Sequence, residues 1–189
     1  MTEWKFYHTF VKMKMTNSSI ALRAVEPEDL DLLYLWENDR TVWQVSNTLV
    51  PFSRFQLKQY IESNPSDIYT HQQLRMMIDC METGKPTRTI GIVDLFDFEP
   101  IHSRAGLGIL IASADDRRQG YAYEAIVQMI EYCRKMLFLN QLYCNISANN
   151  IASIRLFRKA GFEITGTKKE WLRTENGWED ELLLQLKTG

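Results

Sequence analysis

Residues 109–122 read ILIASADDRRQGYA, and this stretch decides how the rest of the chain is interpreted. An apolar run at Ile109–Ile111 passes through a short polar loop directly into a helical pattern that begins at Gly120. Apolar side chains then recur with helical spacing at Ala122, Ile126, Met129, Cys133 and Leu137. The stretch therefore predicts a buried strand, a tight loop and the clearest helix of the chain, which ends near Leu139.

The loop between this strand and this helix contains the pattern Arg117-x-x-Gly120-x-Ala122. Gly120 and Ala122 carry little or no side chain, so an anionic ligand can approach the backbone closely. The first N–H groups of a helix are free and lie at the positive end of its dipole, which favours phosphate. Arg117 and Arg118 add charge that suits a pyrophosphate. An ordinary strand–helix connection remains the alternative, because short motifs also match by chance.

A second stretch, Asn150–Phe162, predicts a short helix with polar groups at its start. Asn150 and Ser153 can cap that helix, and they can equally bond the polar groups of a long ligand. Gly161 stops the helix, and Phe162 is placed to close a Schellman-type cap.

Together the two stretches resemble the GNAT superfamily of N-acetyltransferases. The first is similar to its pyrophosphate-binding pattern, Gln/Arg-x-x-Gly-x-Gly/Ala, and the second to its Asn-x-x-Ala/Ser…Gly-Phe helix. The resemblance covers roughly residues 19–187. It implies acetyl-CoA as co-substrate, held by Ile109, Leu110, Ile111, Arg117, Arg118, Gln119, Gly120, Tyr121, Ala122, Asn150 and Ser153.

Within the superfamily, residues 101–105 after an acidic strand resemble bacterial spermidine/spermine N-acetyltransferases. The ribosomal-protein N-terminal acetyltransferases are the next most similar group. The resemblance thus implies transfer of an acetyl group to a primary amine, with a small polyamine such as spermidine first. N-terminal acetylation of a ribosomal or other protein and a non-catalytic CoA-binding module are the alternatives.

The fold class expected is α/β (α+β), a mixed and mostly antiparallel sheet of about seven strands with helices on both faces. Further helices should begin at Pro27 and near Ser53, and a hairpin should form around Asn176-Gly177. The predicted strands are Ile20–Val25, Gln73–Met81, Thr89–Phe98, Arg104–Ala112, Leu142–Ser147, Phe162–Thr174 and Trp178–Leu186. Residues 1–18 are expected to form an N-terminal arm and residues 19–189 one N-acetyltransferase domain.

The GNAT resemblance also implies that the central strands carrying Ile109–Ile111 and Leu142–Ile146 splay apart, with the pantetheine arm between them. Gly106 and Gly108 lie two positions apart on the first of these strands. They fit either a local bend with close backbone approach or a bulky neighbour above them, and the sequence does not separate these interpretations.

A carboxylate is expected to take the proton from the attacking ammonium, and the candidates are Asp94, Asp97 and Glu37. Asp94 and Asp97 are three positions apart on one predicted strand, so we expect them to project to opposite faces. A solvated surface carboxylate is the alternative for each of the three.

A departure from the GNAT pattern concerns the acid that protonates the leaving thiolate. In many relatives it is a tyrosine seven residues after the asparagine, and here that position is Phe157. The preferred explanation is that the thiolate leaves without this acid. Ser153 or Tyr143 acting through a water is the second possibility, and a poor catalyst is the third.

The composition limits which other classes of protein the chain can belong to. The chain has 189 residues, 45% of them hydrophobic and 24% charged, which suits one globular domain. A net charge of −2 argues against a broad nucleic-acid footprint. Three scattered cysteines give neither a disulfide framework nor a metal site, and no run reaches the ~18 apolar residues of a membrane span. We expect a cytoplasmic enzyme without metal, nucleic-acid or membrane partners, and a homo-oligomer by resemblance.

Overall fold

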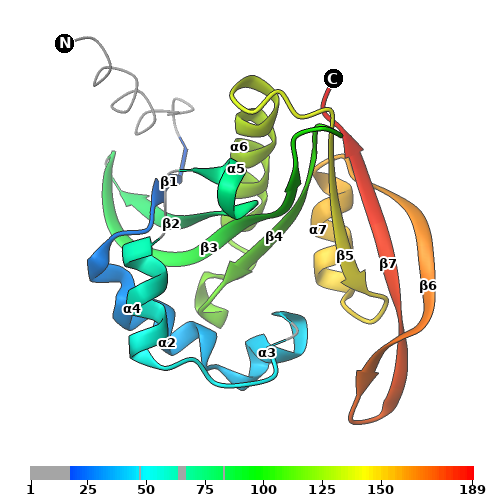
Figure 1. Ribbon diagram of the computed structural model, residues 1–189, viewed down its shortest axis with the longest axis horizontal. Coiled ribbons are helices and arrows are strands. Elements are labelled where there is room, and N and C mark those ends of the chain that lie inside the picture. The colour runs from blue at the N-terminus through cyan, green and yellow to red at the C-terminus, as the bar shows by residue number, and fades with distance from the viewer. Residues whose placement is uncertain (1–17, 47, 64–66, 83) are drawn as a thin grey trace.

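A computed structural model describes residues 18–46, 48–63, 67–82 and 84–189, and it contains a seven-stranded sheet in the order β1-β2-β3-β4-β5-β7-β6 (Figure 1). The strands are β1 Ile20–Ala24, β2 Leu74–Glu82, β3 Lys85–Glu99, β4 Arg104–Ile111, β5 Gln141–Ser147, β6 Glu163–Thr174 and β7 Gly177–Lys187. Among these described strands, β4 and β5 pair in parallel and all other neighbours are antiparallel. The predicted fold class is confirmed.

The helices expected from the sequence are present, and two further short ones were not expected. The helices are α2 Leu30–Glu37, α3 Arg40–Ser46, α4 Arg54–Ser63, α5 Ile68–His71, α6 Tyr121–Lys135 and α7 Ile151–Lys159, with 3-10 turns η2 Pro27–Asp29 and η3 Ala114–Asp116. The two unexpected helices, α3 and α5, have only 7 and 4 residues, too few for a periodic pattern to emerge. No helix in the described ranges is both long and apolar enough to cross a membrane.

The sheet is covered on both faces. One core contains Val93 and Leu95 of β3 together with Ile126 and Met129 of α6. A second core contains Ile92 of the same strand, packed with α2 and α4. Figure 1 shows α2 and α4 on one side of the sheet and α6 and α7 on the other. Successive side chains of β3 therefore enter different cores, which explains its continuous apolar run.

The expected arm, residues 1–18, lies outside the described residues except for Ser18. The hydroxyl of Ser18 donates to Glu124 Oε2 at 2.9 Å, and Gln128 Nε2 donates to the Ser18 hydroxyl, also at 2.9 Å. These contacts fix the entry of the chain against α6, two residues before β1 begins.

Strands β4 and β5 part after only three paired positions. Arg104, Ala105 and Gly106 pair with Gln141, Leu142 and Tyr143. Beyond that point residues 107–111 pair only with β3, and residues 144–147 pair only with β7. We call the gap beyond Gly106 and Tyr143 the fork. It confirms the prediction that these two central strands splay apart.

Two glycines in β3 and β4, Gly91 and Gly106, lie where a side chain has no room. A Cβ on Gly106 would lie 2.2 Å from Phe96 Cε2, whereas one on Gly108 would lie 3.6 Å from Phe96 Cε1. The aromatic ring of Phe96 therefore covers this part of β4, which settles the open question about Gly106 in favour of a bulky neighbour. At Gly91 the obstacle is backbone, since a Cβ would lie 2.0 Å from the carbonyl oxygen of Leu110.

The end of α7 and the last hairpin form as the sequence predicted, except that the hairpin turn is shifted by one position. Phe162 N–H donates to Phe157 O and Gly161 N–H to Arg158 O, both at 3.0 Å, which is the Schellman pattern. In the last hairpin Thr174 pairs with Gly177, so the turn residues are Glu175 and Asn176, one position earlier than predicted.

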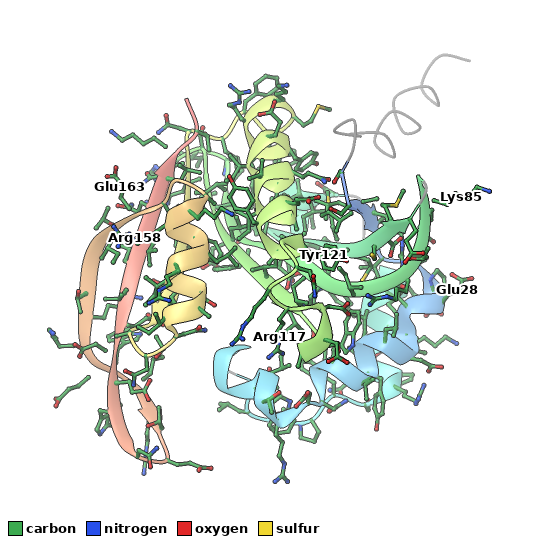
Figure 2. All side chains as sticks on the ribbon, turned by 180° about the vertical axis from the view of Figure 1, so that it is seen from behind. Glu28, Lys85, Arg117, Tyr121, Arg158 and Glu163 are labelled. Atoms are coloured by element: carbon green, nitrogen blue, oxygen red, sulfur yellow. The ribbon has the colours of Figure 1, made fainter. Side chains whose placement is uncertain are left out.

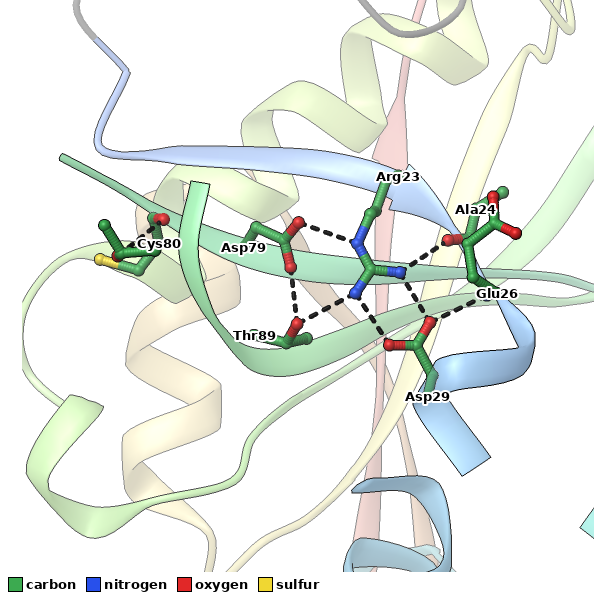
Figure 3. Close-up of polar contacts among 8 residues, drawn as sticks. Arg23, Ala24, Glu26, Asp29, Asp79, Cys80 and Thr89 are labelled. Carbon is green, nitrogen blue, oxygen red and sulfur yellow. Dashed lines mark hydrogen bonds and ion pairs between the residues drawn. The ribbon is translucent and has the colours of Figure 1, made fainter. Parts of the chain in front are cut away.

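A buried polar network holds the start of α2 against the sheet edge (Figure 3). Arg23 Nη1 donates to Asp29 Oδ2 at 2.6 Å, and Arg23 Nε donates to Asp79 Oδ2 at 2.8 Å. Thr89 Oγ1 donates to Asp79 Oδ1 at 2.8 Å. The hydrogen bond with Asp29 is the largest cause that raises the pKa of Arg23. The network ties β1, β2, β3 and η2 together and so fixes the direction in which α2 leaves the sheet.

Gly91→Ala should destabilise the protein by roughly 1–3 kcal/mol, because the new methyl group collides with a backbone carbonyl that cannot rotate away. Gly108→Ala is the matched control, since its methyl group would be in ordinary contact with Phe96. Chemical denaturation of the two variants and the wild type measures the difference. Equal unfolding midpoints for the two variants would contradict the close approach of β3 and β4 at Gly91.

Candidate active site

The start of α6 presents free backbone donors. Gly120 is the N-cap, it has φ +90°, and no side chain caps this helix end. The first bond inside the helix runs from Glu124 N–H to Gly120 O at 3.1 Å. Among the described residues, none accepts a hydrogen bond from the N–H groups of residues 120–123. Such a helix end is suited to an anion.

The loop before α6 is held in an unusual backbone conformation. Arg118 has φ +65°, a region that non-glycine residues rarely occupy. A Cβ added to Gly120 would meet nothing within 4 Å. Gly120 is therefore required for its backbone angle, and the space in front of it is open to a ligand.

Arg117 bends back onto the end of β4. Its Nε donates to Ile111 O at 3.1 Å and its Nη2 to Ala112 O at 3.2 Å. Figure 2 shows Arg117 and Tyr121 at the same end of α6. The side chain of Arg117 thus stabilises the strand–loop junction, whereas the sequence had suggested a direct phosphate contact for both arginines.

Asn150 caps the start of α7, as predicted by the interpretation that needs no ligand. Asn150 Oδ1 accepts a hydrogen bond from Ser153 N–H at 3.1 Å. Lys159 Nζ lies 4.2 Å from the centroid of the Tyr123 ring, which links α7 to the first turn of α6. This contact holds the C-terminal end of α7 beside the N-terminal turn of α6.

Phe157 belongs to the core. It is 3% exposed, and its ring meets that of Phe162 edge-on at a centroid distance of 5.1 Å. A phenylalanine side chain carries no acidic proton. Any group that protonates the thiolate must therefore be another residue or water.

Two of the three carboxylate candidates share one arginine. Arg75 Nε and Nη2 donate to the two carboxylate oxygens of Asp94 at 2.7 and 2.9 Å, and Arg75 Nη1 donates to Glu37 Oε1. Burial alone would lower the pKa of Arg75, but the charges of Asp94 and then Glu37 raise it. The Arg75 guanidinium also lies 5.7 Å from the centroid of the Tyr60 ring. The structure brings Glu37 and Asp94 together, as a largely buried ion cluster.

Sequence reasoning had overlooked Arg75. The signal that could have found it is register: Arg75 of β2 stands directly opposite Asp94 of β3. Opposite charges on facing positions of adjacent strands pair favourably. The register itself depends on bulges between Ile78 and Asp79 and between Cys80 and Met81, and these were not predicted.

The expectation that Asp94 and Asp97 project to opposite faces is wrong. Val93 and Leu95 enter the core, and the next core residue on this strand is Phe98, three positions further on. Asp97 has φ +48°, and the pairing of β3 with β4 skips between Phe96 and Glu99. This bulge places the extra residue, Asp97, on the same face as Asp94 and Phe96.

Asp97 is bonded to a tyrosine from β5. Tyr143 Oη donates to Asp97 Oδ2 at 2.8 Å, and the rings of Tyr143 and Phe96 meet edge-on at 5.9 Å. Burial first, and then the hydrogen bond to Asp97, raise the pKa of Tyr143 above its usual range. The phenol therefore stays protonated and remains a donor to the carboxylate.

A cavity of about 600 Å³ lies between α2 and the end of β4. The Arg88–Asp116 ion pair forms part of its wall. Its other lining residues are Leu32, Tyr34, Leu35, Trp36, Asn38, Asp39, Thr89, Ile90, Ala112 and Ser113. The cavity is on the α2 side of the sheet and adjoins the loop that leads to α6; sequence reasoning did not find it.

Comparison with known proteins finds two bacterial spermidine N(1)-acetyltransferases among the relatives of this chain. The chain is 25% identical over 149 residues to spermidine N(1)-acetyltransferase of Vibrio cholerae, covering 77% of this chain and 80% of that protein. It is 27% identical over 149 residues to the Escherichia coli enzyme of the same name, covering 78% and 75%.

Among solved structures, the V. cholerae spermidine N-acetyltransferase in complex with CoA and spermine superimposes with a TM-score of 0.80 at 22% identity, covering 91% of this chain and 97% of that one. A dodecameric structure of that enzyme gives a TM-score of 0.74 at 21% identity, covering 91% and 95%. At these identities the structural likeness concerns the fold.

The sequence profile described as "Acetyltransferase (GNAT) domain" matches residues 19–163. That span is well over half of the 189 residues and includes the fork, the start of α6 and α7. The chain therefore belongs to the GNAT acetyltransferase family.

Proposed function

We propose that this protein transfers the acetyl group of acetyl-CoA to a primary amine, with a small polyamine such as spermidine as the first candidate. The observation that carries the proposal is the row of free N–H groups at residues 120–123, next to the fork. The curated relatives that the chain matches over about three quarters of its length are named for spermidine.

The fork and the two helix starts fit the parts of the co-substrate. The free N–H groups at the start of α6, with Arg118 and Gln119, suit the diphosphate. Residues 109–111 of β4 have no strand neighbour on the fork side, so the amides of the pantetheine arm can pair with them. Asn150 and Ser153 border the opposite side through α7. We propose this set as the acetyl-CoA site.

Direct attack of the amine on the thioester suits the site better than an acyl-enzyme. Burial raises the pKa of Cys133 and of Cys144 to about 12, so neither thiol is a nucleophile at neutral pH. A backbone N–H of β4 that points into the fork would polarise the thioester carbonyl and stabilise the oxyanion. Holding the amine beside that carbonyl supplies much of the rate.

The leaving group has no tyrosine at position 157 to protonate it, so the CoA thiolate leaves unassisted or takes its proton from water. Thiolates are stable enough near neutral pH for this step to proceed. Free buried cysteines are typical of a reducing compartment, so we place the reaction in the cytoplasm. By analogy with the dodecameric relative, we expect a homo-oligomer.

A screen of amine acceptors tests the activity and its substrate class. Release of the CoA thiol should be fastest with spermidine or spermine, and much slower with amino acids, aminoglycosides or peptides that carry ribosomal-protein N-termini. A peptide as the best acceptor would favour N-terminal acetylation instead. Tight binding of acetyl-CoA without transfer to any amine would favour a non-catalytic CoA-binding module.

Gly120→Glu should weaken acetyl-CoA binding by at least about tenfold, or ~1.4 kcal/mol, because its carboxylate would enter the space in front of the free N–H groups. Gly177→Glu is the matched control: Gly177 also has a positive φ (+119°) and open space around its Cβ, but it lies in the β6–β7 hairpin. Isothermal titration with acetyl-CoA measures both. Equal affinity of the two variants for acetyl-CoA would show that the diphosphate does not bind at the start of α6.

A further inference from the structure

Three strands meet in one aromatic contact at the point where the fork begins. Phe96 of β3 faces Gly106 of β4, and Gly106 faces Tyr143 of β5. Because Gly106 has no side chain, the rings of Phe96 and Tyr143 touch across the middle strand. Tyr143 therefore reaches over β4 at the last paired position before the strands part.

The bulge in β3 supplies a carboxylate to this contact. An unbroken alternation would direct residue 97 into the core, where Phe98 lies instead. The positive φ of Asp97 keeps its side chain on the face of Phe96, where the Tyr143 hydroxyl donates to it at 2.8 Å. Positive φ at a non-glycine residue is costly and concentrates at functional sites.

Asp97 differs from the other two carboxylate candidates in its surroundings. Both oxygens of Asp94 and one oxygen of Glu37 are bonded to the Arg75 guanidinium, so protonation of either carboxylate would weaken a charge-assisted interaction with a cation. Among the described residues, no cationic side chain lies within ion-pairing distance of Asp97. Its side chain is exposed, and Tyr143 occupies only Oδ2.

We propose that Asp97 accepts the proton of the attacking ammonium and that Tyr143 is the positioning residue that holds Asp97 at the fork. This inference rests on the proposed function and deepens it by assigning the base. It also gives the Arg75 cluster a structural role, which removes Glu37 and Asp94 from the proton-transfer step.

The step transfers a proton from the ammonium to Asp97 and the acetyl group from sulfur to nitrogen. An N–H bond of the ammonium breaks, and its proton passes to Asp97 Oδ1, directly or through one water. The freed lone pair forms the C–N bond, and the C–S electron pair leaves with the thiolate. As the amide forms, the nitrogen loses a second proton, which balances the one that the thiolate takes up. Asp97 then returns its proton to solvent.

Removing only the hydroxyl of Tyr143 tests the positioning role. Tyr143→Phe keeps the ring contact with Phe96 and should lower kcat about tenfold, with little change in KM for the amine, because one hydrogen bond to a charged group is lost. Tyr69→Phe is the matched control. Tyr69 is exposed on α5 and its ring meets Phe98 edge-on, so this variant keeps its packing and should retain wild-type kcat.

Removing the carboxylate tests the base. Asp97→Ala should lower kcat by about 10²–10⁴-fold, the usual contribution of a positioned base. Added formate should restore part of that loss, because a small carboxylate can occupy the vacated space and accept the proton. In the Asp97→Ala background Tyr143→Phe should cause no further loss, since the group that Tyr143 positions is gone. Unchanged thermal unfolding midpoints exclude a folding defect.

The outcomes separate this inference from the proposed function. A wild-type protein that acetylates amines, together with a Tyr143→Phe variant of unchanged kcat or an Asp97→Ala variant that formate does not rescue, would overturn the inference alone. A wild-type protein that transfers acetyl to no amine would overturn both. Additive losses in the double variant would show that Tyr143 does not act through Asp97.

Discussion

The parting of β4 and β5 after three paired residues is the constraint on which the rest of the site depends. A backbone strand that loses its neighbour leaves N–H and C=O groups without partners, which is costly unless water or a ligand satisfies them. Here the unpaired edge of residues 107–111 leads straight to the free N–H groups of α6. Apart from the carbonyl groups of Ile111 and Ala112, which accept hydrogen bonds from Arg117, backbone groups of this edge and of the helix start are available to a long ligand with amides and a diphosphate.

The two sides of the sheet contribute different parts of the proposed chemistry. The α6 and α7 side supplies helix starts whose dipoles suit an anion, and the α2 side supplies the carboxylates and the cavity beside α2. Arg75 compensates part of the negative charge of Glu37 and Asp94 on the α2 side. Asp97 remains as the carboxylate at the fork with no cation beside it in the described part of the chain.

Phe157 and Tyr143 together describe how this chain differs from the family pattern. The residue that many relatives use as an acid is here part of the core, packed on Phe162 at the helix cap. The phenol that the structure does place at the fork is tied to a carboxylate, and burial keeps it protonated. The hydroxyl is available for positioning, and the chemistry rests on the amine, the thioester and the carboxylate.

The sequence by itself determined the features that depend on residues close together in the chain. The helical stripe after Gly120, the Schellman cap at Gly161 and the hairpin near Asn176 are local, because spacing, backbone angles and caps act within a few residues. Only the tertiary structure decided that Arg75 joins Glu37 to Asp94, that a bulge turns Asp97 to the face of Phe96, and that Tyr143 crosses Gly106 to reach it. These contacts depend on strand register, and register is set by the packing of the whole sheet.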